Sequence, residues 1–125
     1  MKTPCEIFSR EFLPSIKALL AKSVMEAYSL TQHEAARRLK TTQPAISHYL
    51  REARGKKAKE LEKDEEIRKK IQEMVGKLNK EVDEVEFFRF FCDVCRVLRE
   101  RKRFCKYCNL GENCTACLRG DGMWK

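Results

Sequence analysis

The stretch LTQHEAARRLKTTQPAISHYLR, from Leu30 to Arg51, contains the signals that decide the fold. Thr31 followed by Glu34 forms a capping box, in which each side chain bonds the other residue's backbone N–H, so a helix is predicted to begin there. Thr42 is a second N-cap, and Pro44 falls in the first turn after it, where the missing N–H does no harm. Two short helices joined by a three-residue turn are therefore predicted, which is a helix-turn-helix.

Both predicted helices have a buried face of small or apolar residues. Ala36 is small, as it must be where a second helix crosses closely, and the full set is Ala35, Ala36, Leu39, Ile46, Tyr49 and Leu50. Ser15–Tyr28, upstream, shows the helical period as well, with Pro14 near its start.

The stretch resembles the helix-turn-helix of phage-repressor-like (XRE-type) transcription factors, and the wider layout resembles small archaeal regulators of that class. The resemblance implies that Gln32 contacts a DNA phosphate and that Gln43 reaches an adenine edge in the major groove. Basic residues around the two helices would grip the DNA backbone. The implied DNA contacts are Gln32, Arg37, Arg38, Lys40, Thr42, Gln43, Pro44, Ser47, His48, Arg51, Arg54, Lys56 and Lys57.

The turn departs from the family pattern at two positions. The family usually has Gly where this chain has Lys40, and an aliphatic residue where this chain has Thr41. A non-glycine residue with positive φ costs about 1–2 kcal/mol, so the family's turn geometry would be strained here.

Composition points to a polyanionic partner and not to a membrane. The 125 residues include 27 Lys and Arg against 19 Asp and Glu, a formal net charge of +8. Double-stranded DNA is the expected partner, although a basic protein without such a partner stays open. No signal peptide and no long apolar run is present, so a cytoplasmic location is expected. No Ser-His-Asp set, phosphate loop or paired acids indicate an enzyme.

A second helical signal begins at Asp64, a good N-cap. An apolar stripe follows, and the amphipathic stretch from Ile67 to Val85 that contains it is the predicted interface of a homodimer that reads a palindromic operator. Gly76 and Asn79 leave room for a break into two helices. The stripe consists of Ile67, Ile71, Met74, Val75 and Leu78, and the pattern continues to Val85 and Phe91. The interpretation is an all-α helical bundle with four parts: a DNA-binding domain at 1–55, a linker at 56–63, dimerisation helices at 64–91 and a small irregular cysteine-rich module at 92–125.

Six paired cysteines lie in that module, at Cys92, Cys95, Cys105, Cys108, Cys114 and Cys117. A CxxC pair brings two thiolates to one metal, and two pairs make a four-sulfur site. As the group bound by these cysteines, an iron–sulfur cluster of the 4Fe–4S type is slightly favoured over structural zinc, and both alternatives stay open. A thiol oxidoreductase is not favoured, because the sequence lacks the βαβ pattern in which a thioredoxin-like CxxC pair lies. The isolated Cys5 could complete a site if the N-terminal helix folds back onto the tail.

The predicted function is a sequence-specific transcriptional regulator whose cysteine pairs bind an iron–sulfur cluster and report on redox state or iron. The alternative is a constitutive nucleic-acid-binding protein with a structural zinc site.

Overall fold

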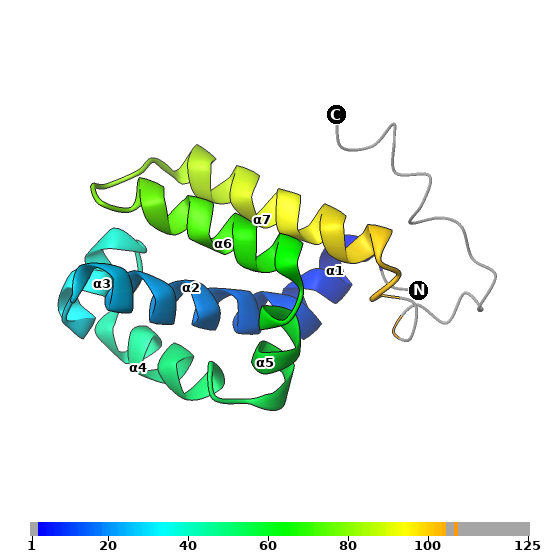
Figure 1. The fold of residues 1–125 in the computed structure, drawn as a ribbon, viewed down its shortest axis with the longest axis horizontal. Coiled ribbons are helices and arrows are strands. Elements are labelled where there is room, and N and C mark those ends of the chain that lie inside the picture. Colours follow the sequence, from blue (N-terminus) through cyan, green and yellow to red (C-terminus); the bar gives the residue numbers. More distant parts are fainter. Residues whose placement is uncertain (1–2, 105–106, 108–125) are drawn as a thin grey trace.

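A computed structural model describes residues 3–104 and Tyr107 (Figure 1). Every regular element in this part of the chain is helical, which confirms the predicted all-α class. The elements are α1 (Pro4–Ile7), the π-helical turn η1 (Phe8–Phe12), α2 (Leu13–Tyr28), α3 (Gln32–Arg38), α4 (Gln43–Glu52), α5 (Lys56–Glu62), α6 (Glu65–Lys77) and α7 (Glu84–Glu100). None of these helices is long and apolar enough to span a membrane.

Helices α1 and α2 are joined by the π-helical turn η1, which is wider than an α-helical turn. Thr3 caps α1, and the Leu13 N–H donates to the Phe8 carbonyl, five residues earlier. Pro14 follows at once; a proline has no N–H, and its ring crowds the carbonyl four residues before it. The π turn accommodates this proline, so the chain enters α2 without a break.

Helix α2 forms the centre of the bundle. In Figure 1, α4 and α5 lie on one side of it, and α6 and α7 lie on the other. Ile16, Leu19, Leu20 and Val24 of α2 are buried, and α2 packs against α3, α4, α5 and α6. Buried residues from all the helical elements join one hydrophobic core.

The segment expected to be a linker, residues 56–63, differs from that expectation. It forms α5, and its apolar residues Ala58 and Leu61 are buried in the common core. The two lie three positions apart, so they share one face of an otherwise charged helix. The N-terminal helical unit therefore does not end at residue 55, because α5 and α6 complete its core.

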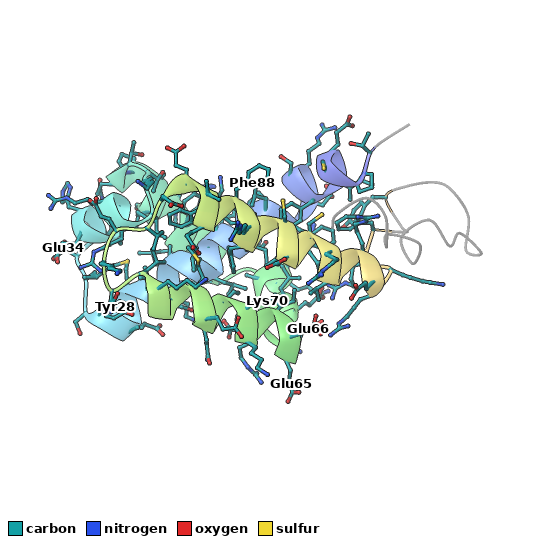
Figure 2. The ribbon with its side chains drawn as sticks, turned by 90° about the horizontal axis from the view of Figure 1, so that it is seen from above. Tyr28, Glu34, Glu65, Glu66, Lys70 and Phe88 are labelled. Atoms are coloured by element: carbon teal, nitrogen blue, oxygen red, sulfur yellow. The ribbon has the colours of Figure 1, made fainter. Side chains whose placement is uncertain are left out.

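The apolar stripe of α6 makes up most of the predicted dimer interface from Ile67 to Val85, but it is buried inside its own chain, so these residues do not offer a surface to a second copy. Ile67, Ile71, Met74, Val75 and Leu78 are each at most 8% exposed. The Tyr28 hydroxyl also donates to the Val75 carbonyl at 2.7 Å, which ties α6 to the end of α2. Among the described residues, the large hydrophobic side chains that stay exposed are Val85, at 58%, and Phe88, at 70%; Phe88 projects outward from α7 (Figure 2).

The break between α6 and α7 lies where it was predicted, and α7 then runs through the expected 91/92 boundary. Asp64 caps α6 and also accepts a hydrogen bond from Arg101 Nε at 2.6 Å. Burial alone raises the pKa of Asp64, but hydrogen bonds from Arg101 and from the N–H groups of Ile67 and Glu66 outweigh it and hold that pKa below its ordinary value. The pair joins the start of α6 to the end of α7.

Candidate nucleic-acid interface

Helices α3 and α4, here called the α3–α4 unit, begin at the two predicted caps. Thr31 Oγ1 accepts from the Glu34 N–H at 3.2 Å, and Glu34 Oε1 accepts from the Thr31 N–H at 3.3 Å. Thr42 Oγ1 accepts from the Ala45 N–H at 3.3 Å. Because each cap satisfies N–H groups that have no partner in their own helix, both helix starts are fixed locally.

The turn between these helices has the strained geometry expected from the departure at Lys40. The Thr41 N–H donates to the Ala36 carbonyl at 2.9 Å, and the Lys40 N–H donates to the Arg37 carbonyl at 3.3 Å. This pair of bonds is the Schellman motif, which places one residue in the left-handed region. Lys40 occupies that position, with φ of 55°.

Helix α4 is held firmly against the core. Its Ile46 is fully buried, and Ala35 and Ala36 of α3 are buried beside it. Thr42 lies at its start and Pro44 in its first turn. The packing against α2 and α3 fixes the direction in which α4 presents its outer residues.

The outer face of α4 carries the residues expected to contact DNA. Gln43, Ser47 and Arg51 are four positions apart and none of them is buried, so they share one side of the helix. Pro44 and His48 are exposed beside them. His48 Nε2 lies 3.6 Å from Glu52 Oε1, so the imidazole is directed along the helix toward Glu52.

Gln43 and Gln32 are joined by a direct hydrogen bond. The Gln43 side-chain amide donates to the Gln32 side-chain oxygen, across the two helix starts. Both side chains are half-buried. A glutamine amide has two N–H donors and one carbonyl oxygen, so this bond leaves Gln43 with a donor and an acceptor for a second partner. The bond orients a flexible side chain before any partner arrives.

The basic residues expected to grip the DNA backbone fall into two groups. Five are exposed: Arg37, Lys40, Arg51, Arg54 and Lys56. Two are engaged inside the protein. The Arg38 guanidinium donates to the Leu78 carbonyl, at the end of α6. Lys57 Nζ lies 3.8 Å from Glu11 Oε2 and 5.1 Å from the centroid of the Phe12 ring.

Lys59 and Lys63 form part of a basic hollow that the expected contacts did not include. The hollow, of about 390 Å³, is also lined by Arg54, Lys56 and Glu60. Lys56 and Lys59 lie three positions apart on α5, and Lys63 follows four positions later, just after the helix, so the three lysines share one side. The sequence signal that could have identified Lys59 and Lys63 is the helical periodicity of residues 56–63. Charged residues dominate this segment and obscure that periodicity.

Cys92 and Cys95 lie on α7, three positions apart. Cys95 is buried in the core and Cys92 is half-buried. Burial raises the pKa of the Cys92 thiol, and the neighbouring Cys5 and Asp93 add to the rise, so α1 does bring Cys5 near α7. Within residues 3–104 no three Cys, His, Asp or Glu side chains form a metal-binding group. The remaining predicted ligands, Cys105, Cys108, Cys114 and Cys117, lie outside the described residues.

Comparison with known proteins gives no match: no family model, no curated protein and no solved structure is significantly similar to this chain.

Proposed function

We propose that this protein is a DNA-binding transcriptional regulator that uses the α3–α4 unit as a helix-turn-helix of the phage-repressor-like kind. The single observation that carries the proposal is the bonded pair Gln32–Gln43 at the start of a helix whose inner face is anchored in the core. An oriented glutamine can pair with adenine N6 and N7 in the major groove. Holding its rotamer in advance reduces the entropy lost on binding.

Exposed cations on and beside α4 support a duplex as the partner. Arg51, Arg54 and Lys56 are exposed along the end of α4 and the start of α5, and the chain has a net charge of +8. Such side chains can contact phosphates on either side of the groove that α4 enters. The geometry therefore supports base contacts from the first turns of α4 and phosphate contacts from its end.

The first test asks whether Gln43 reads a base. Duplexes selected from a random pool by the full chain define the preferred sequence. Gln43→Ala should then lose discrimination at one base pair, by about 1–3 kcal/mol, while binding to unrelated duplex changes little. Gln72→Ala, on the exposed surface of α6, is the matched control and should keep the wild-type preference. An unchanged preference in Gln43→Ala would remove α4 as the reading helix.

The second test asks whether the basic face contacts phosphates. The dependence of log K on log salt should become shallower by about 0.9 for each phosphate that the variant no longer neutralises. Arg51→Gln should show this change, whereas Arg68→Gln, an exposed arginine on α6, should keep the wild-type slope. Equal slopes for both variants and the wild type would contradict phosphate contact through Arg51.

The cysteine module belongs to the proposal as an iron–sulfur site, with structural zinc as the alternative. Its support is the sequence spacing, because Cys92 and Cys95 are the only paired cysteines among the described residues. Anaerobic purification followed by an absorption spectrum and metal analysis tests it. Brown protein with iron and sulfide supports a cluster; colourless protein with zinc supports the structural site. A homodimer on a palindromic operator also stays a proposal, and its interface must lie outside the buried stripe of α6.

A further inference from the structure

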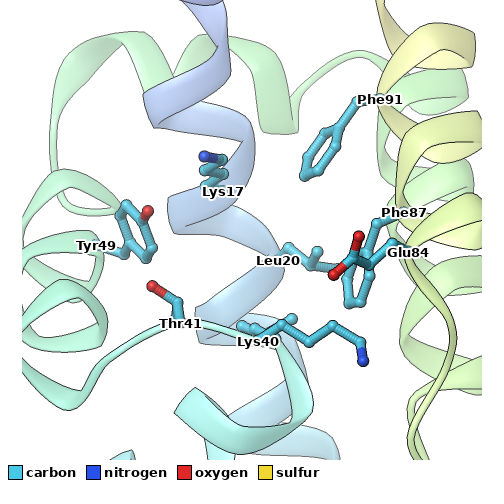
Figure 3. Close-up of a pocket in the computed structure, with 9 residues that line it drawn as sticks. Lys17, Leu20, Lys40, Thr41, Tyr49, Glu84, Phe87 and Phe91 are labelled. Carbon is cyan, nitrogen blue, oxygen red and sulfur yellow. The ribbon is translucent and has the colours of Figure 1, made fainter.

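A pocket of about 280 Å³ lies between the α3–α4 unit and α7 (Figure 3). Its walls come from four places in the chain: α2, the turn after α3, Tyr49 on α4, and the first half of α7. The residues that matter for its chemistry are Lys17, Leu20, Thr41, Tyr49, Phe87 and Phe91. Of the residues that line this pocket, Lys40 alone is also an expected DNA contact.

One end of the pocket is polar and rich in hydrogen-bond donors. Figure 3 shows Lys17, Thr41 and Tyr49 gathered on the side of the pocket that faces α4. An ammonium group only donates hydrogen bonds, and a hydroxyl can rotate to donate. Three donors around one space, one of them charged, are suited to a carboxylate.

The other end is mainly apolar, with Glu84 beside it. Phe87 and Phe91 line it from α7, and Leu20 lines it from α2. The two phenyl rings have centroids 6.5 Å apart and planes 22° apart, so they form a stacked surface. Aromatic rings pack at such separations in offset or edge-to-face arrangements, and a third ring can join this pair.

The charges that line the pocket favour an anion at the polar end. Lys17 is the charged residue at that end, whereas the Lys40 side chain extends toward α7, where Glu84 lies (Figure 3). No ion pair among the described residues involves any of these three side chains. In Figure 3 Glu84 lies beside Phe87, on the α7 side. A ligand with its anionic group at Lys17 would therefore keep that group away from the carboxylate of Glu84.

We infer that this pocket binds a small molecule made of one aromatic ring and one carboxylate. The ring would pack on Phe87, Phe91 and Leu20, and the carboxylate would accept from Lys17, Thr41 and Tyr49. The volume of the pocket agrees with such a ligand. A cavity of about 150 Å³ holds benzene, so the larger volume here leaves room for a short acidic side chain on the ring. Pockets that bind larger ligands usually exceed about 300 Å³.

A bound acid would contact Thr41 in the turn, Tyr49 on α4 and Phe91 on α7 at the same time. Ligand occupancy and the position of α4 are then linked, so the acid should change the affinity for DNA, and DNA should change the affinity for the acid by the same factor. This consequence rests on the proposed function. The binding site itself does not, because it can be measured without DNA.

Isothermal titration of the full chain with phenylacetate and with its uncharged amide, phenylacetamide, tests the inference. Phenylacetate should bind, and the amide should bind at least about tenfold more weakly, the loss expected for one charge-assisted hydrogen bond. Lys17→Gln should weaken phenylacetate about tenfold and leave the amide unchanged. Lys22→Gln is the matched control, since Lys22 lies on the same helix but outside this pocket. Tyr49→Phe removes only the hydroxyl and serves as a second variant if Lys17→Gln does not fold.

Equal affinity for the acid and the amide would overturn the inference, and so would a Lys17→Gln variant that binds phenylacetate like the wild type. Absence of heat with either compound at millimolar concentration would also overturn it. If phenylacetate binds as expected but leaves affinity for the selected duplex unchanged, the site stands and its link to DNA binding is refuted. Failure of duplex binding alone would affect only the proposed function.

Discussion

Replacing Lys40 with glycine is expected to stabilise the protein, although glycine destabilises most helical positions. Lys40 has φ of 55°, at the left-handed position of the turn that ends α3. An L-residue in that region costs about 1–2 kcal/mol, and glycine removes this cost. Glycine also loses more backbone entropy on folding, which costs about 0.5–1 kcal/mol. The net gain for Lys40→Gly is therefore about 0.5–1 kcal/mol in the free energy of unfolding.

Two other lysines make the prediction specific. Lys102 is also exposed, has φ of 56°, and its neighbour Arg103 donates to the Leu98 carbonyl at 3.0 Å in the same motif. Lys102→Gly should therefore stabilise the protein as well. Lys69 is exposed in the middle of α6, where glycine should destabilise the protein by up to about 1 kcal/mol. All three variants make the same chemical change, so the effects on the unfolded chain and on net charge are shared.

Urea denaturation followed by far-ultraviolet circular dichroism measures the three free energies. The difference between Lys40→Gly and Lys69→Gly should be about 1–2 kcal/mol, because the unfolded-state contribution cancels and the left-handed cost remains. The slope with urea should not change. If Lys40→Gly lowers the free energy of unfolding as much as Lys69→Gly does, then Lys40 is not held in a left-handed conformation and the described turn is wrong.

Three further changes test the core and the cap. Leu61→Ala should cost about 2–5 kcal/mol because Leu61 is buried, while Glu60→Ala, exposed beside it, should stay within about 0.5 kcal/mol of the wild type. Ala36→Leu should cost about 1–3 kcal/mol by overpacking the contact between α3 and α4, with the same readout. Asp64→Ala should cost about 1–2 kcal/mol at pH 7. Because the folded pKa of Asp64 lies below its ordinary value of 3.8, the charge-dependent part of that loss is present above pH 3.8 and disappears as the pH falls through the folded pKa. The difference in stability between wild type and variant should therefore shrink between pH 7 and pH 2.

Local signals in the sequence were sufficient for the helix boundaries of the α3–α4 unit. Caps act within three or four residues, so Thr31, Glu34 and Thr42 specify their helix starts without help from the rest of the fold. The strain at Lys40 was expected from the resemblance, because the family usually has Gly at this position of the turn, and Lys40 has φ of 55°. These features depend on neighbouring residues alone.

The partner of an amphipathic face could not be predicted in the same way. The α6 stripe requires burial, but periodicity does not say whether α2 or a second copy covers it. The same limit applies to α5, where two buried residues, Ala58 and Leu61, are surrounded by charged ones. The same limit applies to the expected DNA contacts. Arg38 contacts Leu78 and Lys57 contacts Glu11, and both partners are distant in sequence. Composition identified the cations but not the direction in which they point.

The most direct test of DNA recognition by α4 is an amide chemical-shift map of the ¹⁵N-labelled protein titrated with duplex DNA at low salt. The largest shifts should fall on Gln32 and on residues 42–51, which hold the caps and the outer face of α4. The exposed residues of α6, such as Arg68 and Lys69, should shift little under the same conditions. A map centred on α6, or the absence of any shift with excess duplex, would contradict the assignment of α4 as the helix that reads DNA.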